Sequence, residues 1–235
     1  MIINISEIFY SIQGEGVSIG APALFVRLQG CNLTCSWCDT PYTWKPGQNK
    51  DFKRYRIVDV VEEIASQLQA AHSATIVVLT GGEPLLQQKQ IKEIIALLRE
   101  RGISVDYEIE TNGTIFPDVL KNHSKNIRLN VSPKLANSDV PKEKRFNRNV
   151  LDQLASTDSG FRTTFKFVIS SMTDFDEIFT DFSFLPREKI IIMPEGTTRE
   201  SQLDGISSYI EICKENGLRL IPRLHTLIWE NRRGV

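Results

Sequence analysis

Short runs of apolar, mostly β-branched residues alternate along this chain with segments whose apolar residues recur at helical spacing. In residues 57–69, Ile57, Val60, Val61, Ile64 and Leu68 fall at the spacing of one helix face. Residues 86–101 and 199–216 show the same pattern, and a glycine follows each of them, where a helix is expected to end. The pattern therefore predicts three amphipathic helices.

Apolar runs between these helices predict strands at residues 23–29, 74–80, 104–111, 127–132, 163–170, 188–193 and 218–222. Strands that alternate with helices indicate a parallel sheet with helical crossovers, and continuous apolar runs suit strands buried on both faces. We therefore expect an α/β fold with mainly parallel strands. We also expect one domain over residues 1–235, because no internal repeat or domain boundary is visible.

Two polar and mostly basic stretches, residues 42–56 and 133–149, interrupt this alternation. We favour solvated loops as the simpler interpretation, and a lid over a substrate is the alternative.

Composition and charge exclude several classes of protein. The 235 residues carry a formal net charge of −1, with 41% hydrophobic and 24% charged residues, which is ordinary for a globular protein. We therefore expect neither nucleic acid nor a membrane as a partner. The first residues do not resemble a signal peptide, so we expect a cytoplasmic protein whose thiols stay reduced.

Three of the four cysteines, Cys31, Cys35 and Cys38, lie within one short segment. Three thiols cannot all pair among themselves, whereas clustered thiolates are soft metal ligands. A cluster of four irons on three thiolates leaves one iron open; a structural zinc site is the alternative, although no histidine lies nearby in the sequence. Cys213 falls on the apolar stripe of the predicted helix 199–216, so we interpret it as a core residue.

The residues with unusual chemistry follow the predicted strands. They lie in or around Cys31 and in residues 80–84, 110–113, 132–134 and 193–196. Because ligands of parallel α/β sheets bind at the carboxyl ends of the strands, we expect the functional site at that edge.

The spacing C-x-x-x-C-x-x-C, with Trp37 before the last cysteine, resembles the radical S-adenosylmethionine superfamily. The run Gly81-Gly82-Glu83-Pro84 after the next strand matches the second hallmark of that superfamily. The resemblance implies a partial (β/α) TIM-like barrel. It also implies a 4Fe–4S cluster on the three cysteines, with S-adenosyl-L-methionine on the open iron.

Residues 9–16 (FYSIQGEG), 25–33 (FVRLQGCNL) and 38–40 (CDT) resemble the 7-carboxy-7-deazaguanine synthase family, and the resemblance continues through residues 223–225. The family converts 6-carboxy-5,6,7,8-tetrahydropterin to 7-carboxy-7-deazaguanine with loss of ammonia, in queuosine biosynthesis. The resemblance implies that a 5′-deoxyadenosyl radical abstracts a substrate hydrogen before the ring contracts. It also implies an electron donor such as a flavodoxin or ferredoxin, and a homodimer.

The resemblance assigns roles to individual residues. It places S-adenosylmethionine against Ser36, Trp37, Cys38, Asp39, Gly82, Ser132, Pro133 and Lys134. It places the substrate against Ile12, Gln13, Gly14, Glu15, Arg27 and Thr80, with His225 and the carboxylate of Val235 closing the site. Thr40 is the implied Mg²⁺ ligand, and Glu195 is a further candidate. From the residues alone, a structural ion pair explains Arg27 as well as substrate binding does, and Lys134 could equally be a surface lysine. Thr40 would be interpreted as a helix or turn cap.

Two other functions stay open at this point. Another small radical enzyme, such as a glycyl-radical activase, would keep the cluster but act on a protein, and it gives residues 12–16 no role. A structural zinc or cluster protein would need a fourth protein ligand and would have no use for the glycine run.

Overall fold

The computed structural model describes residues 1–48, 52–71, 76–230 and 232–235. These residues form one nine-stranded sheet with the order β3-β1-β2-β4-β5-β6-β7-β8-β9. From β2 to β9 each strand runs parallel to its neighbours, whereas β1 is antiparallel to β2 and β3. The strands are β1 (Ile2–Ile12), β2 (Pro22–Leu28), β3 (Lys53–Arg56), β4 (Ile76–Gly81), β5 (Tyr107–Thr111), β6 (Ile127–Val131), β7 (Arg162–Ile169), β8 (Ile190–Pro194) and β9 (Arg219–Leu220).

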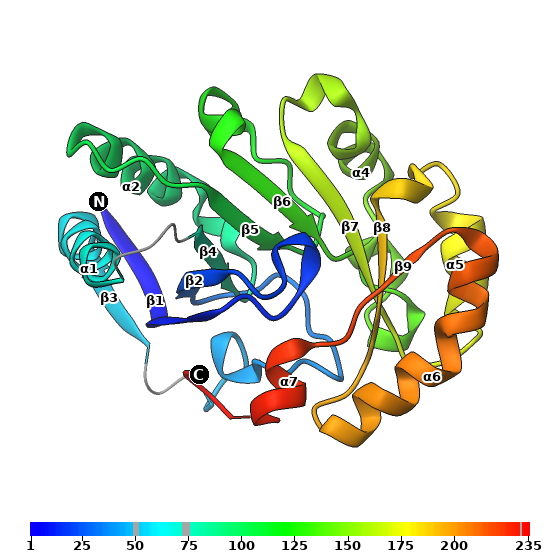
Figure 1. The fold of residues 1–235 in the computed structure, drawn as a ribbon. Coiled ribbons are helices and arrows are strands. Elements are labelled where there is room, and N and C mark those ends of the chain that lie inside the picture. Colours follow the sequence, from blue (N-terminus) through cyan, green and yellow to red (C-terminus); the bar gives the residue numbers. More distant parts are fainter. Residues whose placement is uncertain (49–51, 72–75, 231) are drawn as a thin grey trace.

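The helices are α1 (Ile57–Ala70), α2 (Gln88–Glu100), α3 (Lys142–Arg145), α4 (Arg148–Ala155), α5 (Asp174–Asp181), α6 (Arg199–Asn216) and α7 (Leu224–Trp229). Helices α1, α2, α4, α5 and α6 lie along the outer side of the curved, open sheet (Figure 1). The short α7 differs from the others, since it lies across the end of the sheet near the C-terminus (Figure 1). The expected α/β partial barrel with mainly parallel strands is therefore confirmed.

Alternate side chains of the strands face two different environments. In β7, Phe165, Phe167 and Ile169 join the core that also contains residues of α1, α2, α5 and α6. The alternate residues Lys166 and Val168 face the inside of the sheet and line a cavity there. Cys213 lies in the core on α6 and is buried, as the sequence predicted.

The inside of the sheet carries a buried polar network, which the apolar runs did not predict. Gln13 and Asn130 each donate hydrogen bonds to both Glu108 and Glu110, at 2.6 to 3.2 Å. Burial and the neighbouring Glu110 raise the pKa of Glu108. These strands are therefore buried on both faces, but only the outer face is apolar.

The predicted helices 57–69, 86–101 and 199–216 correspond to α1, α2 and α6. The N-terminal strand β1 was not predicted, nor were the short helices α4, α5 and α7. The predicted strand 218–222 contracts to two residues in β9. Positions 74 and 75 of the predicted strand 74–80 and His72 lie outside the described residues.

The prediction of solvated loops was wrong in part for both polar stretches. Within residues 42–56, Lys53–Arg56 forms β3 and pairs with β1; residues 49–51 lie outside the described residues. Within residues 133–149, α3 forms, and Ser138, Val140 and Arg145 are buried. The Arg145 guanidinium donates to the carbonyls of Val140 and Lys134, so this stretch is internally braced.

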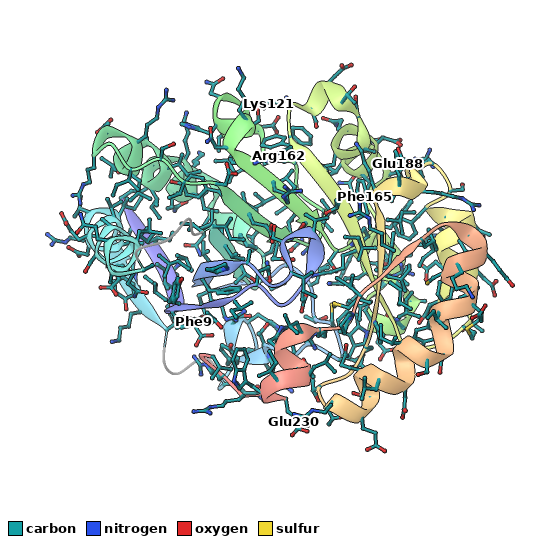
Figure 2. All side chains as sticks on the ribbon, in the orientation of Figure 1. Phe9, Lys121, Arg162, Phe165, Glu188 and Glu230 are labelled. Atoms are coloured by element: carbon teal, nitrogen blue, oxygen red, sulfur yellow. The ribbon has the colours of Figure 1, made fainter. Side chains whose placement is uncertain are left out.

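The two ends of the sheet differ in what they carry. Arg162 and Glu188 lie at the end where the parallel strands begin, and Glu230, just after α7, lies at the opposite end (Figure 2).

Among the described residues, no helix combines the length and the apolar character that crossing a membrane requires.

Candidate active site

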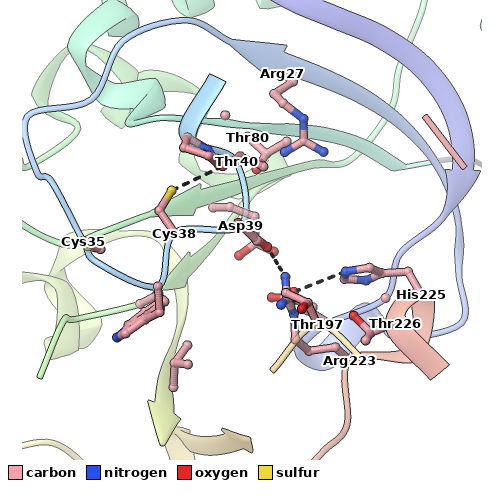
Figure 3. Close-up of a pocket in the computed structure, with 18 of the residues that line it drawn as sticks. Arg27, Cys35, Cys38, Asp39, Thr40, Thr80, Thr197, Arg223, His225 and Thr226 are labelled. Atoms are coloured by element: carbon pink, nitrogen blue, oxygen red, sulfur yellow. Dashed lines mark hydrogen bonds and ion pairs between the residues drawn. The ribbon is translucent and has the colours of Figure 1, made fainter. Parts of the chain in front are cut away.

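A cavity of about 720 Å³ opens at the carboxyl ends of the parallel strands, as expected. Arg27, Thr40 and Thr80 lie on one side of it, and Arg223, His225 and Thr226 lie on the other (Figure 3). Pro133, which was expected to contact S-adenosylmethionine, is buried and is not among the described residues that line the cavity. The predicted residues that do line it are Ile12, Gln13, Gly14, Glu15, Arg27, Cys31, Cys35, Ser36, Trp37, Cys38, Asp39, Thr40, Thr80, Gly82, Ser132, Lys134, Glu195, His225 and Val235.

The cysteine loop is held in place by backbone hydrogen bonds to neighbouring segments. The Gly30 amide donates to the Thr43 carbonyl at 2.7 Å, and the Ser36 amide donates to the Ser138 carbonyl at 3.0 Å. Leu33 and Val140 pack with the cysteines in a small apolar cluster. The loop is therefore fixed at both ends and shielded on one side.

The three thiols suit a bound cluster in chemistry and surroundings. Burial raises the pKa of Cys31 to about 11 and also raises the pKa of Cys35, so binding a metal must displace their protons. Backbone and indole N–H groups already point at the sulfurs: Leu33 N lies 3.4 Å from Cys31 Sγ, and Trp44 Nε1 lies 3.3 Å from Cys38 Sγ. Such hydrogen bonds are typical of cluster thiolates.

The zinc alternative fits the same loop poorly. Within the described part of the chain, no three His, Cys, Asp or Glu side chains are grouped so as to hold a metal ion. A single zinc ion needs its sulfur ligands about 2.3 Å away, and hence close together. A cubane binds each thiolate at a different iron, so it does not require the three sulfurs around one ion.

The second glycine of the pair at the end of β4, Gly82, has a packing reason that the sequence did not show. A Cβ atom on Gly82 would lie 2.0 Å from the carbonyl oxygen of Gly30 and 3.0 Å from Cys31 Cβ. The following Glu83 is fully buried and accepts from Thr111 Oγ1 at 2.8 Å and from the Asn112 amide at 2.7 Å. This turn therefore joins the ends of β4 and β5 and supports the start of the cysteine loop.

Charged side chains alternate in sign across the other side of the cavity. Lys166 is paired with Glu15 and lies 3.0 Å from Glu110 Oε2, and Arg223 Nε donates to Glu15 Oε1 at 3.0 Å. Arg223 also pairs with Asp39. Burial alone would raise the pKa of Glu15, but Lys166 and Arg223 hold it well below the ordinary value. Glu15 is therefore an ionised acceptor in this wall.

Arg27 combines an ion pair with exposure to the cavity. Its Nε donates to Glu7 Oε1 at 2.6 Å, so the ion-pair alternative holds for that atom. Burial alone would lower the pKa of Arg27, yet the neighbouring Tyr42 and Glu7 raise it. The guanidinium therefore stays charged beside the cavity.

Thr40 and Lys134 differ from their simpler interpretations. Thr40 precedes the short 3-10 turn Pro41–Thr43, but its side chain makes no capping hydrogen bond and lies 3.8 Å from Cys38 Sγ. Lys134 Nζ donates to Ser132 Oγ at 3.0 Å and lies 5.2 Å from the centre of the Trp37 ring. Both side chains therefore belong to the cavity wall.

The start of α7 packs directly on the segment after β1. A Cβ atom on Gly14 would lie 2.1 Å from His225 Nδ1, and the Leu224 amide donates to the Gly14 carbonyl at 2.9 Å. His225 Nε2 lies 4.0 Å from Glu15 Oε1, and burial lowers the pKa of His225. The start of α7 and the segment after β1 thus pack together beside the cavity.

Several cavity residues were missed from the sequence, among them Lys166, Arg223, Tyr42 and Arg233. Lys166 left a signal, because it is the only charged residue within the predicted strand 163–170. The others lie in irregular segments, where neither period nor motif distinguishes a cavity residue from a surface residue.

The chain was compared with known proteins. It matches the model of the radical SAM superfamily over residues 25–157. It is 34% identical to the 7-carboxy-7-deazaguanine synthase of Pyrobaculum aerophilum, with 99% of this chain and 97% of the relative covered. It is 30% identical to the synthase of the same name from Bacillus subtilis, with 99% and 98% covered.

Two solved structures are similar in fold. The crystal structure of QueE from Escherichia coli matches with a TM-score of 0.72 and 26% identity, over 96% of this chain and 95% of that chain. Native anSMEcpe with bound AdoMet matches with a TM-score of 0.53 and 16% identity, over 83% of this chain and 62% of that chain.

Proposed function

Because this chain belongs to the radical SAM superfamily and, within it, to the 7-carboxy-7-deazaguanine synthase family, we propose roles for its cavity residues in that reaction. The enzyme is a carbon–nitrogen lyase that converts 6-carboxy-5,6,7,8-tetrahydropterin to 7-carboxy-7-deazaguanine with loss of ammonia. The glycyl-radical activase is not favoured, since relatives that match nearly the whole chain carry the synthase name. The observation that carries the assignment of roles is the meeting of three cysteines and a charged wall in one cavity.

In this proposal Cys31, Cys35 and Cys38 would hold the 4Fe–4S cluster. When bound, the cluster and S-adenosylmethionine would supply the radical chemistry that starts the reaction. Ser36, Asp39, Ser132 and Lys134 line the cavity with the cysteines and offer polar atoms, so we assign them to the adenosylmethionine with Trp37 and Gly82. Pro133 contributes through the position that it gives to its neighbours rather than through the cavity surface.

The substrate is flat and carries a carboxylate, and the two sides of the cavity suit these features. Arg27 offers a guanidinium for the carboxylate. The Gln13 side chain is engaged by Glu108 and Glu110, so the segment Ile12–Gly14 presents its backbone to the heterocycle instead. Glu15 supplies an ionised acceptor for the N–H groups of the pterin. Thr80, Glu195, His225 and the Val235 carboxylate complete the enclosure.

Mg²⁺ is proposed at Thr40, whose hydroxyl group is not used as a cap. Magnesium keeps several waters and takes substrate oxygens, so one hydroxyl ligand beside a bound carboxylate is sufficient.

We further propose that the chain acts as one domain and pairs as a homodimer, with a flavodoxin or ferredoxin as its electron donor. One continuous sheet through the described residues supports the single domain. A reducing compartment, the cytoplasm, suits the free cysteines.

The test is anaerobic incubation of the reconstituted protein with reductant, S-adenosylmethionine and the carboxylated pterin, followed by mass spectrometry. The expected product is 7-carboxy-7-deazaguanine, with 5′-deoxyadenosine released alongside it. Cleavage of S-adenosylmethionine without a deazapurine would exclude this substrate and keep the radical class. Absence of both, in a preparation with full iron content, would exclude the radical class as well.

A further inference from the structure

Glu7 is a largely buried carboxylate that joins three distant parts of the chain. Its Oε1 accepts from Arg27 Nε at 2.6 Å and from the Tyr42 hydroxyl at 3.0 Å, and its Oε2 accepts from Arg233 Nε at 3.1 Å. The donors come from β2, from the turn after the cysteine loop and from the C-terminal segment. Only 15% of the Glu7 side chain is exposed. One side chain therefore fixes three elements of the cavity wall.

The first consequence concerns the orientation of Arg27. A guanidinium can bind a carboxylate through Nε and one terminal nitrogen, or end-on through both terminal nitrogens. Glu7 occupies Nε, and the structure gives the terminal nitrogens no hydrogen-bond partner among the described residues. Figure 3 shows the guanidinium directed toward Thr80, inside the cavity. Arg27 is thus arranged for end-on binding.

The second consequence concerns the C-terminal segment. Arg233 lies over the Tyr42 ring, with its guanidinium carbon 3.9 Å from the ring centre, while its Nε reaches Glu7. Arg232, Arg233, Gly234 and Val235 all line the cavity. The Glu7–Arg233 pair therefore ties this segment to the wall that carries Arg27.

We propose that Glu7 is a positioning residue, which turns Arg27 end-on toward the substrate carboxylate and latches the C-terminal segment beside it. The inference rests on the proposed function and names how that site selects a carboxylated heterocycle over the same heterocycle without the carboxylate. Glu7 contacts Arg27 and Arg233 rather than the substrate, so its effect is on selectivity.

The test compares two ligands in the holoenzyme under anaerobic conditions. Dissociation constants are measured for 6-carboxytetrahydropterin and for tetrahydropterin that lacks the carboxylate, in wild type and in Glu7→Gln. Glutamine keeps the shape but has a single acceptor oxygen and no charge, so Arg27 and Arg233 cannot both be held. The preference for the carboxylated ligand should fall about tenfold. A purely structural role would weaken both ligands alike.

Arg233→Met provides a second variant, because Arg233 is 42% exposed and its replacement is not expected to affect folding. It should reduce the preference about threefold while leaving the Glu7–Arg27 pair in place. Glu62→Gln is the matched control, since Glu62 forms an exposed ion pair with Arg101 and neither residue is among the described residues that line the cavity.

An unchanged preference in Glu7→Gln and in Arg233→Met would overturn the inference. The same preparations are assayed for deazapurine product. If wild type forms no product and prefers neither ligand, the proposed function and the inference are both wrong. If wild type forms product and both variants keep the wild-type preference for the carboxylated ligand, only the inference is wrong.

Discussion

Lys166 is a buried cation between two carboxylates, and replacing it with methionine tests the proposed electrostatics of the cavity. Its side chain is 6% exposed and contacts Glu15 and Glu110, the latter at 3.0 Å. Methionine keeps most of the length and removes the charge. Glu15 keeps Arg223 as a partner at 3.0 Å, whereas Glu110 loses its cation.

The expected cost follows from leaving a buried charge without its partner. Removing one member of a buried ion pair costs about 3–5 kcal/mol. Because Glu15 retains Arg223, we expect the lower end, about 3 kcal/mol of unfolding free energy at pH 7.

The cost should depend on pH in a defined direction. The pKa of Glu15 lies well below its ordinary value of 4.5, since Lys166 and Arg223 more than offset burial. A carboxylate with a lowered pKa contributes stability that is complete above pH 4.5 and is lost as the pH falls through the folded-state pKa. The difference between wild type and Lys166→Met should therefore be largest near neutral pH and should narrow below pH 4.5.

The assay is urea unfolding followed by circular dichroism at several pH values. Lys214→Met is the matched control, because Lys214 pairs with Glu211 at 2.8 Å but is 65% exposed. The control should change stability by less than about 1 kcal/mol. A loss in Lys166→Met no larger than in the control, or a loss that is independent of pH, would refute the reasoning.

Three further changes separate the parts of the site. Gly82→Ala should cost about 1–3 kcal/mol through the clash with Gly30 and lower the iron content after reconstitution; normal iron content would contradict the packing argument. Gly14→Ala should keep the iron but weaken substrate binding, because it displaces His225, and calorimetry with the pterin checks this. Thr40→Val should flatten the response of product formation to added Mg²⁺, and an unaltered titration would remove Thr40 from the metal site.

The sequence was most informative where the spacing of apolar residues or a short motif reflects the local geometry of the chain. The helix 199–216 was predicted with its ends, because its apolar stripe and Gly217 coincide. The placement of the site at one edge followed from chain direction, since every parallel strand brings its carboxyl end to the same side. The cysteines and the double glycine were found through their spacing.

What the sequence did not reveal depends on contacts between distant segments. Glu7 and Arg233 are 226 positions apart, and no local pattern relates them. The strand β1 was missed although Ile3 and Ile5 alternate with polar residues, because its pairing partner β2 fixes it through a bulged register. The resemblance assigns Gly82 to S-adenosylmethionine, and the backbone of Gly30 gives a separate reason for its lack of a side chain, which the sequence did not show.

The central claim is that three cysteines, and not the fourth, hold a cluster with one iron left for S-adenosylmethionine. The direct measurement is iron content and 5′-deoxyadenosine release after anaerobic reconstitution of single alanine variants at Cys31, Cys35, Cys38 and Cys213. Cys213 is buried in the core on α6, so its variant should keep about four irons per chain and the cleavage activity. Each of the other three should lose both. Loss of the cluster in Cys213→Ala, or its retention with activity in Cys38→Ala, would contradict the account.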